Sequence, residues 1–288
     1  MAAGVSGIVT LTASNTLTIT NAGDITSDGN VNLTGSGATF TAGNVTTTAD
    51  PVKYFSNTIL TGDVVIVTDG GNINFAGTLN GDSSVGLSPN LSMTAGTGDI
   101  TFSENVGTGF SLGTVTVTCA RTTNMVKQFT AATLALVAPG TTTVSGNLTL
   151  STALTVAAGA YNVSILGSTN SVAGATVFNN TGTLAIGNLG AVNTTSQFTG
   201  GITAIAPSSV GLNGTITTQG ATAMNFGAAA VVLQSPTILN SNGGAITLGG
   251  TLNSIVTPRS LTITAGLGDI VFAGPVGATV PLLSLIHI

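Results

Sequence analysis

Acidic residues are the first candidates for chemistry in this chain, because three of them occupy the same position of a repeated motif. Asp24, Asp99 and Asp269 each follow a glycine-containing corner and precede a short apolar run. Carboxylates in such corners either accept hydrogen bonds from local backbone amides or supply oxygen ligands to calcium. Calcium needs several oxygen ligands, and the repeat Gly-Gly-x-Gly-x-Asp is absent from the sequence. We therefore expect local corner hydrogen bonds, with calcium binding as the alternative.

The remaining carboxylates are spread thinly along the chain. Asp63, Asp69 and Asp82 form the densest group, and Glu104 stands alone. Polysaccharide-cleaving enzymes need two acids, or an acid and a base, that meet across the substrate. No phosphate loop, zinc spacing or Ser/His/Asp set is present, and His287 is the single histidine. We expect no catalytic, cofactor or metal site; the alternative is a carbohydrate-active enzyme in which a pair of these acids converges.

Cysteine and basic residues are rare and exclude two further classes of site. Cys119 is the single cysteine, so an intramolecular disulfide and a thiolate metal site are both excluded. It follows an alternating Thr/Val run, which predicts a small buried side chain, with a reactive thiol as the alternative. The four basic residues form no cluster that would neutralise phosphates, so we expect no nucleic-acid partner: Lys53, Arg121, Lys127 and Arg259.

Composition indicates a folded chain with an uncharged surface. Only 5% of the residues are charged, against roughly 25% in ordinary soluble domains. Hydrophobic residues make up 42%, which excludes disorder driven by charge and low hydrophobicity. No apolar run is long enough for a membrane-spanning helix.

One sequence unit is written more than once. Residues 91–102 read LSMTAGTGDITF and residues 261–272 read LTITAGLGDIVF, with a shorter relative, LTITNAGDIT, at 17–26. Apolar residues that alternate with Ser and Thr have strand periodicity, and the glycines permit a tight corner. The unit is therefore predicted to be strand, corner, strand, with these structural residues: Leu91, Gly98, Asp99, Ile100, Leu261, Gly268, Asp269 and Ile270.

Short strands separated by Gly, Asn and Asp corners favour an all-β fold, a parallel β-helix (β-solenoid) with coils of roughly 20 to 25 residues. A β-sandwich would need longer strands with strict inside-outside alternation. No shift in composition divides the chain, so residues 1–282 are predicted to form a single continuous solenoid. A coil cannot stabilise itself, because it buries too little apolar surface, and further repeats of the same chain are its expected partners.

Two segments depart from this rhythm. Residues 48–62 contain the cluster Lys53, Tyr54 and Phe55, and we expect either a longer loop packed on the stack or a protruding binding loop. Residues 119–140 are the other irregular region, in which 129–138 (FTAATLALVA) is predicted to be a strand rather than a helical turn.

The residues at both ends of the sequence predict that it is a fragment of a longer chain. The N-terminus lacks a charged segment followed by a long apolar one, so we expect an internal start rather than a signal peptide. Residues 283–288 (LSLIHI) resemble the translation of a common transposon-based sequencing adapter. We expect a non-native tail there and assign no chemistry to its histidine; a genuine hydrophobic tail is the alternative.

Several phrases resemble the filamentous haemagglutinin family and related β-strand-repeat exoproteins of Gram-negative bacteria: GNVNLT with TLTIT, LSMTAGTGDITF, GNLTLSTALTVAAG and LTITAGLGDIVF. The resemblance implies a right-handed parallel β-helix shaft, secretion across the outer membrane, and adhesion to host-cell or surface glycans or proteins. The family's N-terminal secretion domain is not recognisable in this sequence. We thus expect a non-enzymatic shaft segment of a large secreted or cell-surface adhesin. A surface-layer or phage fibre repeat is the alternative.

Overall fold

The computed structural model describes residues 7–84, 86, 88–188 and 193–288. Every regular element among these residues is a β-strand, and none of them lies in a helix. Accordingly, no helix of the described chain is long and apolar enough to cross a membrane. The chain divides into two compact units, Met1–Thr143 (unit 1) and Val144–Ile288 (unit 2).

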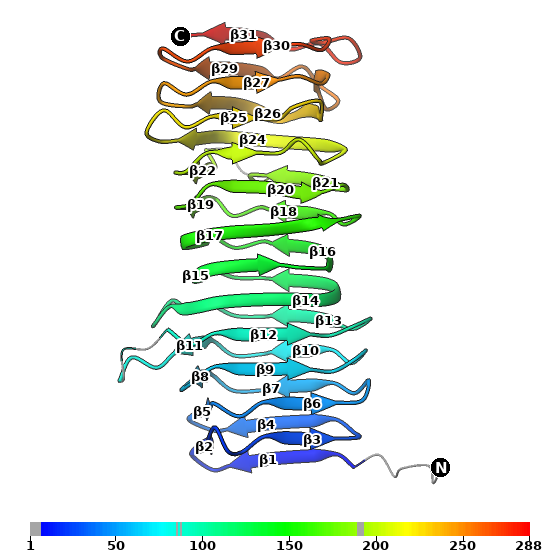
Figure 1. Ribbon diagram of the computed structural model, residues 1–288, viewed down its shortest axis with the longest axis vertical. Coiled ribbons are helices and arrows are strands. Elements are labelled where there is room, and N and C mark those ends of the chain that lie inside the picture. The colour runs from blue at the N-terminus through cyan, green and yellow to red at the C-terminus, as the bar shows by residue number, and fades with distance from the viewer. Residues whose placement is uncertain (1–6, 85, 87, 189–192) are drawn as a thin grey trace. The chain divides into compact units, whose positions relative to one another are not determined.

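Unit 1 consists of turns whose strands pair in parallel with those of the next turn, which makes three ladders (Figure 1). The first contains β1 (Val9–Ala13), β4 (Val31–Gly35), β7 (Val52–Tyr54), β10 (Ile73–Phe75), β13 (Asp99–Phe102) and the end of β14 (Leu112–Met125). The second contains β3 (Ile25–Ser27), β6 (Val45–Thr47), β9 (Val64–Val67), β12 (Leu91–Thr94), the middle of β14 and β15 (Phe129–Leu136). The third contains β2 (Thr16–Ile19), β5 (Ala38–Thr41), β8 (Thr58–Leu60) and β11 (Leu79–Gly81).

Unit 2 has the same organisation. Its first ladder contains β18 (Val163–Ile165), β21 (Thr183–Ile186), the starts of β24 (Ser209–Thr218) and β26 (Ala230–Asn240), and β28 (Leu252–Ser254). The second contains part of β17 (Leu148–Gly159), β19 (Thr169–Val172), β22 (Thr195–Phe198), the ends of β24 and β26, β29 (Ser260–Thr264) and β31 (Ser284–His287). The third contains the rest of β17, β20 (Thr176–Asn180), β23 (Ile202–Thr203), β25 (Met224–Asn225), β27 (Ile246–Leu248) and β30 (Ile270–Phe272). β16 (Pro139–Val144) contains the boundary between the units.

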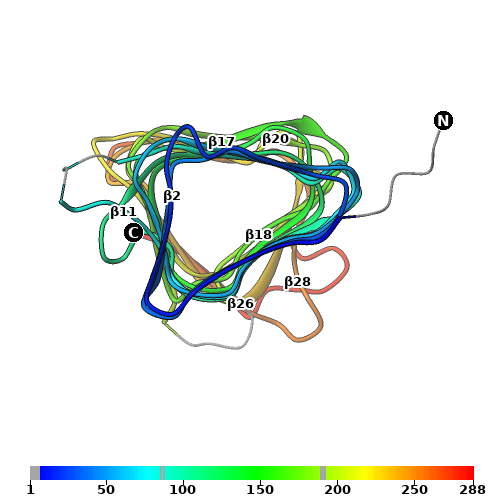
Figure 2. The same ribbon diagram turned by 90° about the horizontal axis from the view of Figure 1, so that it is seen from below.

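These ladders confirm the predicted β-solenoid. Seen along the stack, the blue and cyan turns of unit 1 each trace a three-sided outline (Figure 2). Hydrogen bonds between successive turns join residues that are 20 positions apart in one case, Asp24 and Asn44, and 29 in another, Asn80 and Gly109. Two compact units do not test whether residues 1–282 form one continuous solenoid, which stays a prediction.

Aromatic side chains stack inside unit 1. Parallel register places Tyr54 beside Phe75 and Phe75 beside Phe102, and all three are fully buried. The Tyr54 and Phe75 rings lie 4.7 Å apart, and the Phe75 and Phe102 rings lie 5.3 Å apart. Phe129 adds an edge-on contact to Phe102 at 5.8 Å. Each ring is buried by the next turn, which is why a single turn would be unstable alone.

The repeated sequence unit forms the same corner in each unit. Gly96 has a φ of +60° and Gly266 one of +58°, a left-handed conformation that glycine adopts at little cost. In both corners the following glycine closes the turn, since Gly98 N donates to Ala95 O at 2.9 Å and Gly268 N to Ala265 O at 2.9 Å. The predicted strand, corner, strand pattern is therefore confirmed.

The second glycine of each corner also contacts the preceding turn. A Cβ on Gly98 would lie 2.2 Å from Gly71 O, and one on Gly268 would lie 2.2 Å from Gly244 O. The flanking strand residues Leu91, Ile100 and Leu261 are fully buried, whereas Ile270 is half-buried.

The two segments singled out as irregular are regular strands. Residues 129–136 form β15, so the predicted strand there is confirmed. Residues 48–62 contain β7 and β8, both in register with the turns on either side, so the expected interruption is wrong. Between β11 and β12, the described residues 82–84, 86 and 88–90 lie outside the strands.

Cys119 is half-buried rather than fully buried as predicted. It lies where the register of β12 and β14 shifts, opposite Thr94, and this irregularity turns its side chain partly to solvent. The Cys119 sulfur contacts Gly96 O at 3.6 Å.

Candidate functional site

Corner carboxylates in unit 1 bind the next turn. Asp24 Oδ1 accepts a hydrogen bond from Asn44 N at 2.8 Å, and its Oδ2 accepts one from Asn44 Nδ2 at 3.4 Å. Asp63 accepts the same two hydrogen bonds from Asn90, with Asn90 N 2.8 Å from Oδ1 and Asn90 Nδ2 3.1 Å from Oδ2. The expectation of local corner bonds is therefore wrong for Asp24, because its partner lies one turn further along the chain.

Asparagines continue these links. The side-chain oxygen of Asn44 accepts the amide of Val65 at 2.8 Å, and that of Asn90 accepts the amide of Thr114 at 2.7 Å. Seven more asparagines bind a backbone amide of the next turn in this way: Asn57 to Thr78, Asn72 to Asp99, Asn80 to Gly109, Asn105 to Gln128, Asn147 to Thr169, Asn162 to Thr183 and Asn253 to Thr279. We call these contacts the inter-turn staples. They occur in both units and satisfy backbone amides in corners and near the starts of strands.

The three motif aspartates do not converge. Asp99 accepts hydrogen bonds from Arg121 Nη2 at 2.5 Å, Arg121 Nε at 3.0 Å and Thr122 Oγ1 at 2.7 Å. Asp269 is exposed and, with His287, lines a hollow of about 560 Å³ at the last turn of unit 2. Within the described residues, no three His, Cys, Asp or Glu side chains gather where they would hold a metal ion.

A groove of about 250 Å³ lies on the first ladder of unit 1. It is lined by these residues, and we call it the Lys53 groove: Pro51, Val52, Lys53, Asn72, Ile73, Asn74, Asp99 and Thr101. Lys53 and Asn74 lie directly opposite each other on neighbouring strands, and Thr101 follows on the next. Asn74 Oδ1 is buried and has no hydrogen-bond partner.

The charged side chains around the Lys53 groove differ in their contacts. Arg121 and Asp99 form an ion pair, and the hydrogen bond from Arg121 lowers the pKa of the Asp99 carboxyl. Lys53 Nζ lies 4.3 Å from the centroid of the Phe55 ring, a cation–π contact. Among the described residues Lys53 has no carboxylate partner, since Arg121–Asp99 is the one ion pair found there.

The alternative of a protruding binding loop at Lys53, Tyr54 and Phe55 is wrong for Lys53 and Tyr54. Lys53 and Tyr54 belong to strand β7, and Tyr54 is fully buried within the aromatic stack. Lys53 reaches solvent from strand β7, and Phe55, which follows the strand, is 45% exposed. Strand periodicity was the available signal, since Lys53 is flanked by two inward-facing residues.

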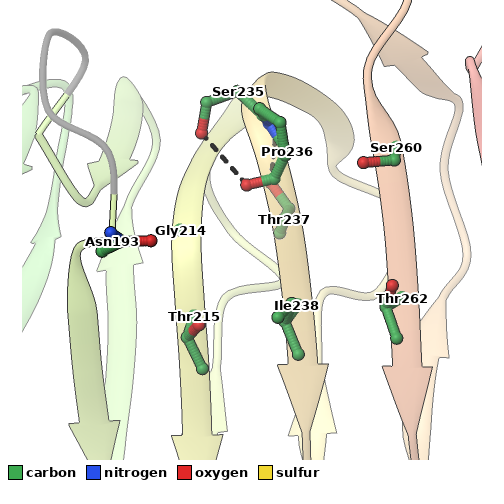
Figure 3. Close-up of a pocket in the computed structure, with 9 residues that line it drawn as sticks. All are labelled: Asn193, Gly214, Thr215, Ser235, Pro236, Thr237, Ile238, Ser260 and Thr262. Atoms are coloured by element: carbon green, nitrogen blue, oxygen red, sulfur yellow. Dashed lines mark hydrogen bonds between the residues drawn. The ribbon is translucent and has the colours of Figure 1, made fainter.

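Unit 2 carries a groove of different chemistry, about 290 Å³ in volume (Figure 3). Thr215, Ile238 and Thr262 lie in a row on β24, β26 and β29, and Ser235 and Pro236 rise beside them. The lining holds no charged side chain. Sequence reasoning missed this groove, because it depends on the register shift between Leu212 and Gly214.

Compared with known protein families, curated proteins and solved structures, the chain shows no match. Its strands and ladders place it in the class of β-solenoid repeat proteins.

Proposed function

We propose that this chain is a non-enzymatic shaft segment of a large adhesin that is secreted or held at the outer membrane surface. The observation that carries the proposal is the series of inter-turn staples. Each staple ties one corner to the next by a side-chain oxygen and a backbone amide, in addition to the strand ladders. Such links suit a segment that projects a binding region and must resist shear between turns.

The partners of the carboxylates support the same proposal. Asp24, Asp63 and Asp99 bind groups of the next turn, and Asp28 accepts a hydrogen bond from Thr48, also one turn on. Asp82 accepts hydrogen bonds from the backbone and hydroxyl of Ser84, which lower the pKa of its carboxyl. These acids act as structural acceptors, and a shaft needs no other chemistry from them.

Immunolabelling of the producing cells tests the proposal. Antibodies raised against the folded 288-residue chain are expected to label intact cells, and deletion of the gene is expected to reduce attachment to host cells or surfaces. Label that appears only after lysis, or unchanged attachment in the deletion strain, would overturn it. A panel of polysaccharides incubated with the purified chain adds a second readout, since released oligosaccharides would favour a carbohydrate-active enzyme instead.

A further inference from the structure

The Lys53 groove presents a fixed row of polar groups. Parallel pairing stacks five outward side chains on successive turns, which gives an amide, an ammonium, an amide, a hydroxyl and an amide: Asn32, Lys53, Asn74, Thr101 and Asn124. Neighbouring paired strands lie roughly 4.8 Å apart. A ligand the size of one sugar ring therefore reaches Lys53 and Asn74 together.

Within the described protein, one acceptor in this row has no hydrogen bond and one ammonium group has no carboxylate beside it. Asn74 Oδ1 is a buried acceptor without a hydrogen bond, and a buried polar atom normally has one. Lys53 has the Phe55 ring beside it but no carboxylate. A ligand with a hydroxyl group and an anionic group would satisfy both, since the hydroxyl donates to Asn74 and the anion accepts from Lys53.

The charge distribution around the groove favours an anion there. The whole chain has a formal net charge of −5 and four basic residues. Two of these, Lys53 and Arg121, lie at or beside the groove, where Asp99 is already neutralised by Arg121. The groove is therefore locally positive on an acidic protein, which draws small anions to it.

The shape of the groove restricts the class of anion. One free ammonium matches a singly charged carboxylate, whereas phosphate sites use several converging donors such as backbone amides at a helix terminus. The exposed Phe55 ring adds an apolar surface for C–H groups. A volume of about 250 Å³ accommodates a single ring rather than a larger ligand.

We propose that the Lys53 groove binds a hydroxylated carboxylate of monosaccharide size, namely a uronic acid residue of an acidic polysaccharide. Its carboxylate pairs with Lys53, one hydroxyl donates to Asn74 Oδ1, and its C–H face lies against Phe55. This assignment does not depend on the shaft proposal, because it rests on the groups of the groove alone.

Ligand-observed NMR titration with the full chain tests the assignment, with D-glucuronate as the probe. Glucuronate is expected to bind saturably, and D-glucose and acetate each about tenfold or more weakly, because each lacks one of the two paired groups. Equal binding of acetate and glucuronate would reveal simple charge attraction and overturn the proposal. Absence of saturable glucuronate binding would also overturn it.

Matched variants locate the site. Lys53→Met keeps the apolar stem and is expected to weaken glucuronate binding about tenfold. Lys127→Met removes an exposed lysine of the same unit outside the groove and is expected to leave binding unchanged. Asn74→Asp is nearly isosteric and is expected to abolish binding by repulsion while the circular dichroism spectrum stays the same. Equal losses in the two lysine variants, or full binding by Asn74→Asp, would contradict the proposal.

Discussion

At the scale of single residues, the corner glycines lie so close to the preceding turn that no side chain would fit between the two turns. Gly98 approaches Gly71 O so closely that a Cβ would lie 2.2 Å from that oxygen. We predict that Gly98→Ala destabilises the chain by about 2 kcal/mol or more, because the clash is with backbone and cannot be relieved by a rotamer change. Urea denaturation followed by circular dichroism measures the loss.

Gly220→Ala is the matched control for this prediction. Gly220 has a φ of +62° and open space around it, so its substitution carries only the conformational cost of about 1 to 2 kcal/mol. If Gly98→Ala proves no more costly than Gly220→Ala, the close approach between turns is not what requires glycine at the corner.

The Asp99–Arg121 pair predicts a specific pH dependence. The pKa of Asp99 is lowered in the folded chain, mainly by the hydrogen bond from Arg121. The pair therefore stabilises the fold above the unfolded pKa of about 3.9, and this contribution is lost as the pH falls through the folded pKa. Since the Arg121 side chain is 67% exposed, the effect at pH 7 is expected to be small.

Thermal melts of the wild type and of Asp99→Asn between pH 7 and pH 2 measure this effect. The variant is expected to melt slightly lower at neutral pH and to converge with the wild type at the acidic end. A gap that persists unchanged at low pH would show that the carboxylate charge is not the source of the difference.

At the scale of elements, the aromatic stack links successive turns of unit 1 through apolar contacts. Phe102 contacts the rings of Phe75 and Phe129 and is fully buried. Phe102→Ala is expected to cost about 3 to 5 kcal/mol, because a cavity opens between two turns. Denaturant titration provides the measurement, and a loss below 1 kcal/mol would mean that the stack collapses around the gap at little cost.

Tyr54→Phe tests the same aromatic stack without removing a ring. Burial raises the pKa of Tyr54, and an interaction of its hydroxyl with the Thr41 side chain opposes that rise. This interaction does not reach hydrogen-bond geometry. Removal of a buried hydroxyl with so weak a contact leaves the ring stack intact, so stability is expected to stay equal or to rise. A clear loss of stability would indicate that the hydroxyl has a partner when the protein is in water.

Much of the fold could be predicted from local pattern, whereas the contacts between turns could not. The Ala95–Gly98 corner is visible in sequence because alternation and glycine spacing are local properties. The sequence predicts a loop at Tyr54, because the cluster Lys53, Tyr54 and Phe55 departs from the strand rhythm. Its place in a core ladder follows from its pairing with Leu33 and Phe75 on other turns.

The candidate sites were harder to predict for the same reason. Asn44 lies 20 residues from Asp24, whereas Gly109 lies 29 residues from its partner Asn80. Turn length varies along the chain, so no fixed spacing identifies which side chains will meet. The groove beside Thr215 and Ile238 depends on a register shift, which leaves no composition signal.

At the scale of the whole molecule, the strand ladders, the staples and the aromatic stack all join one turn to the next within a unit. In such a stack the free energy of unfolding is a sum over the turns and the interfaces between them. A substitution in one turn therefore destabilises that turn and the adjacent ones. We predict that Phe102→Ala accelerates amide hydrogen exchange most in β10, β13 and β14, which pair directly around it. Exchange in β1 and β4, several turns away, is expected to change little.

Hydrogen exchange with mass spectrometry resolves this pattern, and β26 to β29 of unit 2 serve as an internal reference. A gradient of exchange rates that falls off from β13 would show that turns open in small groups, as a shaft built of linked turns requires. Uniform acceleration of all amides in unit 1 would instead show one cooperative block. In that case the staples and the aromatic stack would couple every turn of the unit rather than only neighbours.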